Sequence, residues 1–226
     1  MPFILITLPK TSKMHFISPE LDDYVTAYSE NEPALLAALN RETHLKVLQP
    51  RMLSGHFQGR VLSMLSKLIQ PKNILEIGTY TGYATLCLCE GITSDGILHT
   101  IDIKEELVDF QRKYFDKSAY GNQIRQHLGK ALDIIPNLSG PFDLVFIDAD
   151  KENYIHYFHQ IVPMMNHGGI ILSDNVLWSG KILEEVKAND KSTKVLLEYN
   201  ELLKNDARVE TVLLPIRDGL TVSRVV

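Results

Sequence analysis

The sequence has little cysteine, no long apolar run and no excess of positive charge. The only cysteines are Cys87 and Cys89, and side chains two apart on a helix point to different faces, so no disulfide framework is expected. No apolar run approaches the ~20 residues that a helix needs to cross a bilayer. The net charge of −5 gives no general attraction to nucleic acid or anionic lipid. Because no export signal is recognisable either, we expect a cytoplasmic protein whose partners are neither membranes nor nucleic acids.

The composition is typical of one folded domain. Hydrophobic residues make up 45% and charged residues 23% of the 226 positions, which are ordinary values for a globular protein. We expect a single domain over 1–226, divided into an arm at 1–15, a helical prelude at 16–70 and an α/β core at 71–226. Met14 is an alternative start to Met1, because the recognisable pattern begins just after it.

Helices are expected before Pro71, and strands alternate with helices after it. Ser18 is a good N-cap and Pro19 suits the first helical position. The spacing of apolar residues predicts further helices at about 33–48, 55–69, 105–115, 151–165 and 193–204. Short apolar runs predict strands near 74–77, 97–101, 124–128, 144–147, 170–172, 208–214 and 220–226.

This alternation predicts a mostly parallel sheet covered by helices on both faces, with an antiparallel hairpin at the end. Gly168-Gly169 is expected to end the helix over 151–165. Cys87 and Cys89 are expected in a helix behind a glycine turn, as small core residues.

A glycine-containing turn follows the first strand of the core. Gly78 and Gly82 let the backbone turn tightly and approach a ligand. Asp102 ends the next strand, where a carboxylate can bind the two hydroxyls of a ribose. The alternative is a tight strand–helix turn with an unrelated surface acid.

The same turn argues against a dinucleotide. A dinucleotide site has three glycines spaced G-x-G-x-x-G, and here only two are present. Glu76 would also repel a pyrophosphate. S-adenosylmethionine carries an amino acid end and a ribose but no phosphate, so it fits the turn better. An NAD-dependent oxidoreductase remains the alternative enzyme.

Oxygen-bearing side chains follow two later strands. Asp148 and Asp150 end one strand, and Asp174 and Asn175 end the next. Because neighbouring parallel strands end at the same edge of a sheet, Asp148, Asp174 and Asn175 are expected to surround one point, and such oxygens suit a hard cation such as Mg²⁺. The alternative is that the carboxylates cap a helix and that Asp174-Asn175 forms a polar turn.

Several sequence runs resemble the cation-dependent O-methyltransferases, a family that includes the caffeoyl-CoA and catechol O-methyltransferases and bacterial relatives. The combination of Asp-x-Asp-Lys with a later Asp-Asn is the specific part of the likeness. The runs are Glu76–Tyr83, Phe146–Tyr154 and Asp174–Trp178, with weaker matches at Ile17–Leu21, Met52–Ser54 and Leu214–Gly219.

The resemblance implies a Rossmann-like, seven-stranded sheet with a reversed last strand, and a homodimer. It also implies S-adenosylmethionine and a divalent cation as cofactors, usually Mg²⁺, with Mn²⁺ or Ca²⁺ as alternatives. Lys151 would be the general base, and Asp148, Asp174 and Asn175 would be the metal ligands. The cofactor-binding residues would be Met52, Ser54, Glu76, Gly78, Tyr80, Ala84, Asp102, Ala131, Asp148 and Asp150.

Departures from the family pattern affect the choice of substrate more than the reaction. Ser54 replaces a frequent threonine, Ala84 replaces the serine of plant members, and His56-Phe57 follows Ser54 where relatives are often small or acidic. The resemblance implies methylation of one of two adjacent hydroxyls on a catechol-like or caffeoyl-type molecule. A cofactor-binding protein without catalysis is the non-enzymatic alternative. An N-methyltransferase of nucleic acid is disfavoured, because Asp-Ala-Asp-Lys stands where Asn-Pro-Pro-aromatic is usual.

Overall fold

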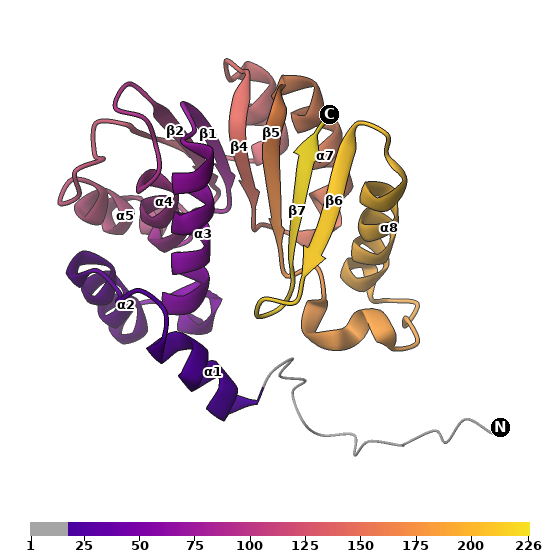
Figure 1. Ribbon diagram of the computed structural model, residues 1–226, viewed down its shortest axis with the longest axis horizontal. Helices are drawn as coiled ribbons and strands as arrows, with labels where there is room; N and C mark the ends of the chain where they lie inside the picture. The colour runs from indigo at the N-terminus through magenta and orange to yellow at the C-terminus, as the bar shows by residue number, and fades with distance from the viewer. Residues whose placement is uncertain (1–17) are drawn as a thin grey trace.

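A seven-stranded sheet forms the centre of the computed structural model, which describes residues 18–226 (Figure 1). The strand order is β3-β2-β1-β4-β5-β7-β6, and β7 alone runs opposite to the other six strands. The strands are β1 (Asn73–Ile77), β2 (Ile97–Asp102), β3 (Ile124–Leu128), β4 (Phe142–Ile147), β5 (Met165–Asp174), β6 (Val209–Leu214) and β7 (Leu220–Val225). The predicted fold class, with its reversed last strand, is therefore confirmed. The arm expected at 1–15 and the alternative start at Met14 lie outside the described residues.

Helices cover both faces of the sheet. Ser18 caps the first helix as predicted, because its hydroxyl accepts a hydrogen bond from the amide of Leu21. The α-helices are α1 (Pro19–Ala27), α2 (Ala34–Lys46), α3 (Gly55–Ile69), α4 (Tyr83–Cys89), α5 (Val108–Phe115), α6 (Ala131–Ile134), α7 (Tyr154–Ile161) and α8 (Lys191–Asn205). Short 3₁₀ helices are η1 (Pro50–Met52), η2 (Glu105–Leu107), η3 (Ile135–Asn137), η4 (Lys151–Asn153), η5 (Val162–Met164) and η6 (Trp178–Leu183). None of the helices within residues 18–226 is long and apolar enough to span a membrane.

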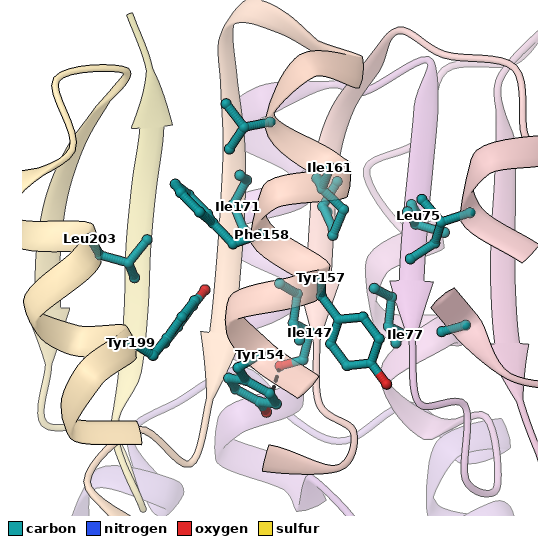
Figure 2. Packing of buried hydrophobic residues seen from close by; sticks show 14 of the residues in the cluster. Leu75, Ile77, Ile147, Tyr154, Tyr157, Phe158, Ile161, Ile171, Tyr199 and Leu203 are labelled. Atoms are coloured by element: carbon teal, nitrogen blue, oxygen red, sulfur yellow. Dashed lines mark hydrogen bonds between the residues drawn. The ribbon is translucent and has the colours of Figure 1, made fainter. Parts of the chain in front are cut away.

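The side chains of the central strands alternate between two apolar cores. Leu75 and Ile77 pack with α7 and α8 on one face, as Figure 2 shows. Ile74 points to the other face and packs with residues of α2 to α5. Cys87 and Cys89 are buried in that second core without a disulfide, as expected for small core residues. Because both faces are covered, the polar groups of the site can gather only at the strand ends.

The prediction of one continuous helix over 151–165 is wrong. Only Tyr154–Ile161 is α-helical, and 3₁₀ turns stand on both sides of it. Pro163 has no amide hydrogen to donate to the preceding turn, so the α-helix ends before it. Gly168-Gly169 does not end this helix, because β5 already begins at Met165 and includes both glycines.

Candidate active site

A cleft of about 930 Å³ lies at the carboxyl ends of the parallel strands. This is near the upper end of the roughly 300–1,000 Å³ that ligand pockets occupy, so it has room for two small molecules. Most of the predicted site residues line it: Met52, Ser54, Gly78, Tyr80, Asp102, Ala131, Asp148, Asp150, Lys151, Asp174 and Asn175. Ala84 lines a small adjoining recess with Met52 and Ser54, and Glu76 lines neither space.

The turn after β1 brings the backbone close to the end of β4. Gly78 has a φ of +98°, and a Cβ there would lie 2.0 Å from the carbonyl oxygen of Asp148. Gly82 has a φ of +87° and packs against the ring of Phe115, where a Cβ would lie 2.5 Å from a ring carbon. Both positions therefore require glycine, and the turn forms an open cradle of backbone that suits a small ligand.

Asp102 is held in place by the same turn. Its Oδ2 accepts a hydrogen bond of 2.7 Å from the amide of Tyr80, and its Oδ1 accepts one of 3.0 Å from the amide of Lys104. Each carboxylate oxygen has a second lone pair. A fixed carboxylate with acceptor capacity left over is what binding a pair of ribose hydroxyls requires.

Glu76 lies beneath the cleft floor. Strand alternation turns its side chain to the same face as Ile74, where it is fully buried. Its Oε2 accepts hydrogen bonds from the hydroxyls of Thr85 and Thr100, at 2.5 and 2.6 Å, whereas its Oε1 has no partner among the described residues. Burial, and secondarily the charges of Asp148 and Asp102, raise the pKa of Glu76 to about 8. An unpartnered buried oxygen is costly, so it is available to a donor group supplied by a ligand.

Replacing Glu76 by glutamine is expected to stabilise the ligand-free protein relative to the wild type, increasingly as pH rises. The raised pKa means that the contribution of Glu76 to stability is present below about pH 4.5 and is lost as pH rises toward 8. Glutamine does not titrate, so the melting temperature of Glu76→Gln relative to wild type should increase steadily between pH 5 and pH 8. Thermal melts over this range test the expectation, and a difference that is constant with pH would contradict it.

Lys151 lies at the centre of the oxygen-bearing side chains. The residue is 6% exposed. Its Nζ donates to Asn175 Oδ1 at 2.9 Å, to Asp148 Oδ1 at 3.2 Å and to the Tyr154 hydroxyl at 2.5 Å. The amine therefore faces the cleft within reach of any hydroxyl group bound beside Asp148 and Asn175.

Asp148, Asp174 and Asn175, the residues predicted to hold a cation, all line this cleft. Asp174 is 2% exposed, and burial together with the charge of Asp148 raises its pKa above the ordinary value, against the opposing effects of Lys151 and Gln58. Asn175 adopts a left-handed φ of 60°, a conformation that asparagine tolerates. Two mutually repelling carboxylates and an amide oxygen are a donor set that fits a hard divalent cation.

Comparison with known proteins shows the family to which the chain belongs. The sequence model of the O-methyltransferase family matches residues 26–226. The chain belongs to the O-methyltransferase family. It is 33% identical to a caffeoyl-CoA O-methyltransferase of Petroselinum crispum over 210 residues, which are 88% of this chain and 87% of the relative. The resemblance deduced from the sequence motifs is thus confirmed at the level of the family.

Solved structures give the same result for this O-methyltransferase. A methyltransferase of Podospora anserina bound to S-adenosylhomocysteine superimposes with a TM-score of 0.83 at 27% identity, covering 92% of this chain and 94% of the other. The O-methyltransferase TomG of Streptomyces achromogenes, solved with S-adenosylmethionine, gives a TM-score of 0.82 at 26% identity, covering 91% and 96%. Membership of the family argues against the NAD-dependent alternative.

Three contacts of the O-methyltransferase site were not predicted from its sequence. Gln58 donates to Asp174 Oδ2 at 2.7 Å, and Arg217 donates to Gln58 Oε1 at 2.9 Å. The hydroxyl of Tyr157 donates to Asp150 Oδ1 at 2.5 Å. Arg217 belongs to a run that resembles the family, but no local pattern indicates a contact with Gln58. Tyr157 itself lines the cleft, but no local pattern indicates its contact with Asp150 either.

Tyr154 supports the site from the core. Its buried hydroxyl shares its one hydrogen between the carbonyl oxygens of Ile147, at 3.2 Å (Figure 2), and of Asp174, at 3.0 Å. The same hydroxyl accepts a hydrogen bond from Lys151. Burial raises the pKa of Tyr154 well above its ordinary value. Because this neutral hydroxyl bonds to both strand ends, it fixes the position of the Lys151 amine relative to β4 and β5.

Proposed function

We propose that this O-methyltransferase transfers the methyl group of S-adenosylmethionine to one hydroxyl of a vicinal diphenol, a catechol-like or caffeoyl-type small molecule. The observation that carries the proposal is the position of Lys151, whose amine lies between Asp148 and Asn175 at one part of a cleft that also contains the glycine turn. The curated relative's name, a caffeoyl-CoA O-methyltransferase, supports an acceptor of this class.

In this proposal Lys151 accepts the proton of the hydroxyl that becomes methylated. A phenol has a pKa near ~10, so it is a poor nucleophile at neutral pH until that proton is removed. Asp148, Asp174 and Asn175 would hold a divalent cation, Mg²⁺ first and Mn²⁺ or Ca²⁺ as alternatives. When bound, such an ion lowers the pKa of oxygens near it and orients a pair of adjacent hydroxyls.

The remaining cleft residues bind and orient in this proposal. Asp102 would accept hydrogen bonds from the ribose hydroxyls, and the Gly78 turn would allow backbone contact with the methionine end. Met52 and Ser54 would cover that end, with Ala131 near the adenine. Holding the methyl donor and the hydroxyl in line supplies much of the acceleration, because orientation replaces a bimolecular encounter.

The reaction class is tested by incubating the protein with S-adenosylmethionine and a set of phenols, with Mg²⁺ or with EDTA, followed by mass spectrometry. Catechol and caffeoyl-type substrates should gain one methyl group only when the cation is present. Phenols with a single hydroxyl are the matched control and should remain unmodified. Cofactor binding without product from any diphenol would favour the non-catalytic alternative, and equal activity in EDTA would contradict cation dependence.

We further propose that the protein is a homodimer in the cytoplasm, as the family resemblance implies. One chain has a mass of 25.6 kDa. Light scattering that gives the mass of one chain at micromolar concentration would contradict the dimer.

A further inference from the structure

Arg217 connects two parts of the cleft that are far apart in the sequence. The residue lies between β6 and β7, and its Nη1 donates to the carbonyl oxygens of Leu53, at 3.2 Å, and of Ser54. The same nitrogen donates to the side-chain oxygen of Gln58 at 2.9 Å. The guanidinium therefore joins the segment Leu53-Ser54, which borders the cleft, to the first turns of α3.

Gln58 is bonded to Arg217 at one end of its amide and to Asp174 at the other. The side chain is 1% exposed, and its amide nitrogen donates to Asp174 Oδ2 at 2.7 Å. Arginine can only donate hydrogen bonds, so the Gln58 oxygen must face Arg217 and the amide nitrogen must face the carboxylate. Arg217 thereby determines which end of the amide meets Asp174.

The orientation of the Asp174 carboxylate depends on this donor. Its other oxygen, Oδ1, accepts a hydrogen bond of 2.8 Å from the amide of Asn175. The side-chain donor and the backbone donor together fix the carboxylate plane, leaving one lone pair on each oxygen for another ligand.

The backbone of Arg217 is itself in an unfavourable conformation. Its φ is +49°, in the left-handed region that glycine adopts without cost and arginine does not. The contacts of the guanidinium with Ser54 and Gln58 hold the residue there. Backbone strain of this kind persists only where the surroundings enforce it, and it gathers at functional positions.

We propose that Arg217 and Gln58 are positioning residues that couple the cofactor end of the cleft, at Leu53-Ser54, to the cation ligand Asp174. A ligand that contacts Ser54 shifts or stiffens the carbonyls to which Arg217 is bonded, and Gln58 transmits this to the carboxylate. Cofactor and cation then bind cooperatively, each raising the affinity for the other by the same factor. The inference rests on the proposed function.

The test measures Mn²⁺ binding by calorimetry, with and without saturating S-adenosylhomocysteine, so no turnover is required. In the wild-type protein the nucleoside should tighten Mn²⁺ binding by about 5- to 150-fold, the usual range for coupled sites. In Arg217→Gly this ratio should fall close to one. Glycine accepts the positive φ, so this variant is expected to fold, and its melting temperature checks that.

Gln58→Leu supplies an independent measurement. Loss of the donor to Asp174 should weaken Mn²⁺ binding itself by about 10- to 100-fold, as removal of an outer-shell partner does at other metal sites.

Arg224→Ala is the matched control for Arg217→Gly, because Arg224 is bonded to Glu210 on the surface of the sheet. Its coupling ratio should equal that of the wild type.

The outcomes separate this inference from the proposed function. Wild-type protein that binds neither Mn²⁺ nor the nucleoside would overturn both. Wild-type protein that binds both without mutual effect would overturn the coupling alone. A folded Arg217→Gly variant with the wild-type ratio would likewise overturn the role of Arg217.

Discussion

Replacing Lys151 by alanine is expected to lower kcat by about 10²- to 10⁴-fold, the usual contribution of a positioned general base. The amine lies 2.9 Å from Asn175 Oδ1 and 3.2 Å from Asp148 Oδ1, and no other lysine is bonded to these two oxygens among the described residues. Affinity for S-adenosylhomocysteine should change little, because the glycine turn and Asp102 are untouched. Steady-state kinetics and calorimetry on the same variant measure both quantities.

The pH profile distinguishes a lost base from a lost charge. As pH approaches ~10, a growing share of the phenol ionises without help, so the deficit of Lys151→Ala should shrink. Lys151→Arg keeps a positive charge but cannot accept a proton at these pH values, so it should also be inactive at neutral pH. Lys194→Ala, on the exposed face of α8, is the control and should match the wild type. A Lys151→Ala variant with full activity at pH 7 would refute the role.

The strand ends of this site could be predicted because the sheet is mostly parallel. Gly78, Asp102, Asp148 and Asp174 each stand at the end of a short apolar run, and parallel strands bring such ends to one edge. The spacing of apolar residues and the order of the strands along the chain were enough to predict these four positions. The antiparallel hairpin expected at the end of the chain corresponds to β6 and β7, but the insertion of β7 next to β5 was not predicted.

The place of Glu76 does not follow from its position at a strand end. Its place just before the glycine turn suggested contact with a ligand, but strand alternation turns it to the interior with Ile74, where Thr85 and Thr100 bond to it. The alternation was readable from the sequence. The contacts with the two threonines were not readable from the sequence. Thr85 reaches Glu76 through the packing of α4, and Thr100 through the pairing of β2 with β1.

Contacts between distant side chains could not be predicted at all. Gln58 and Asp174 are 116 positions apart, and Arg217 lies 163 positions after Ser54. Each of these contacts depends on where α3 and the β6–β7 connection pack against the sheet. A single sequence contains no local pattern that reports such a pairing, so the support of the cation ligands emerges only from the fold.

Asp148→Asn is expected to remove the response of the protein to divalent cations. The substitution takes one of two carboxylates from the oxygen set and leaves Asp174 and Asn175 as ligands. In the wild type, Mg²⁺ at 100 times its Kd should add about 2.7 kcal/mol to the free energy of unfolding, because only the folded state binds it. Thermal melts should therefore show a rise in melting temperature with Mg²⁺ in the wild type and none in Asp148→Asn, whose methyl transfer should fall by more than about 100-fold.

Asp133→Asn controls for the loss of a negative charge as such, because Asp133 is exposed on α6 outside the cleft. Its melting temperature should rise with Mg²⁺ as in the wild type. An Asp148→Asn variant that keeps both the Mg²⁺-induced rise and its activity would show that the cation binds elsewhere. If Asp148→Asn loses the Mg²⁺-induced rise in melting temperature but is as active in EDTA as the wild type, the cation stabilises the fold and takes no part in methyl transfer. Only the joint loss of both responses supports Asp148 as a ligand of a catalytic cation.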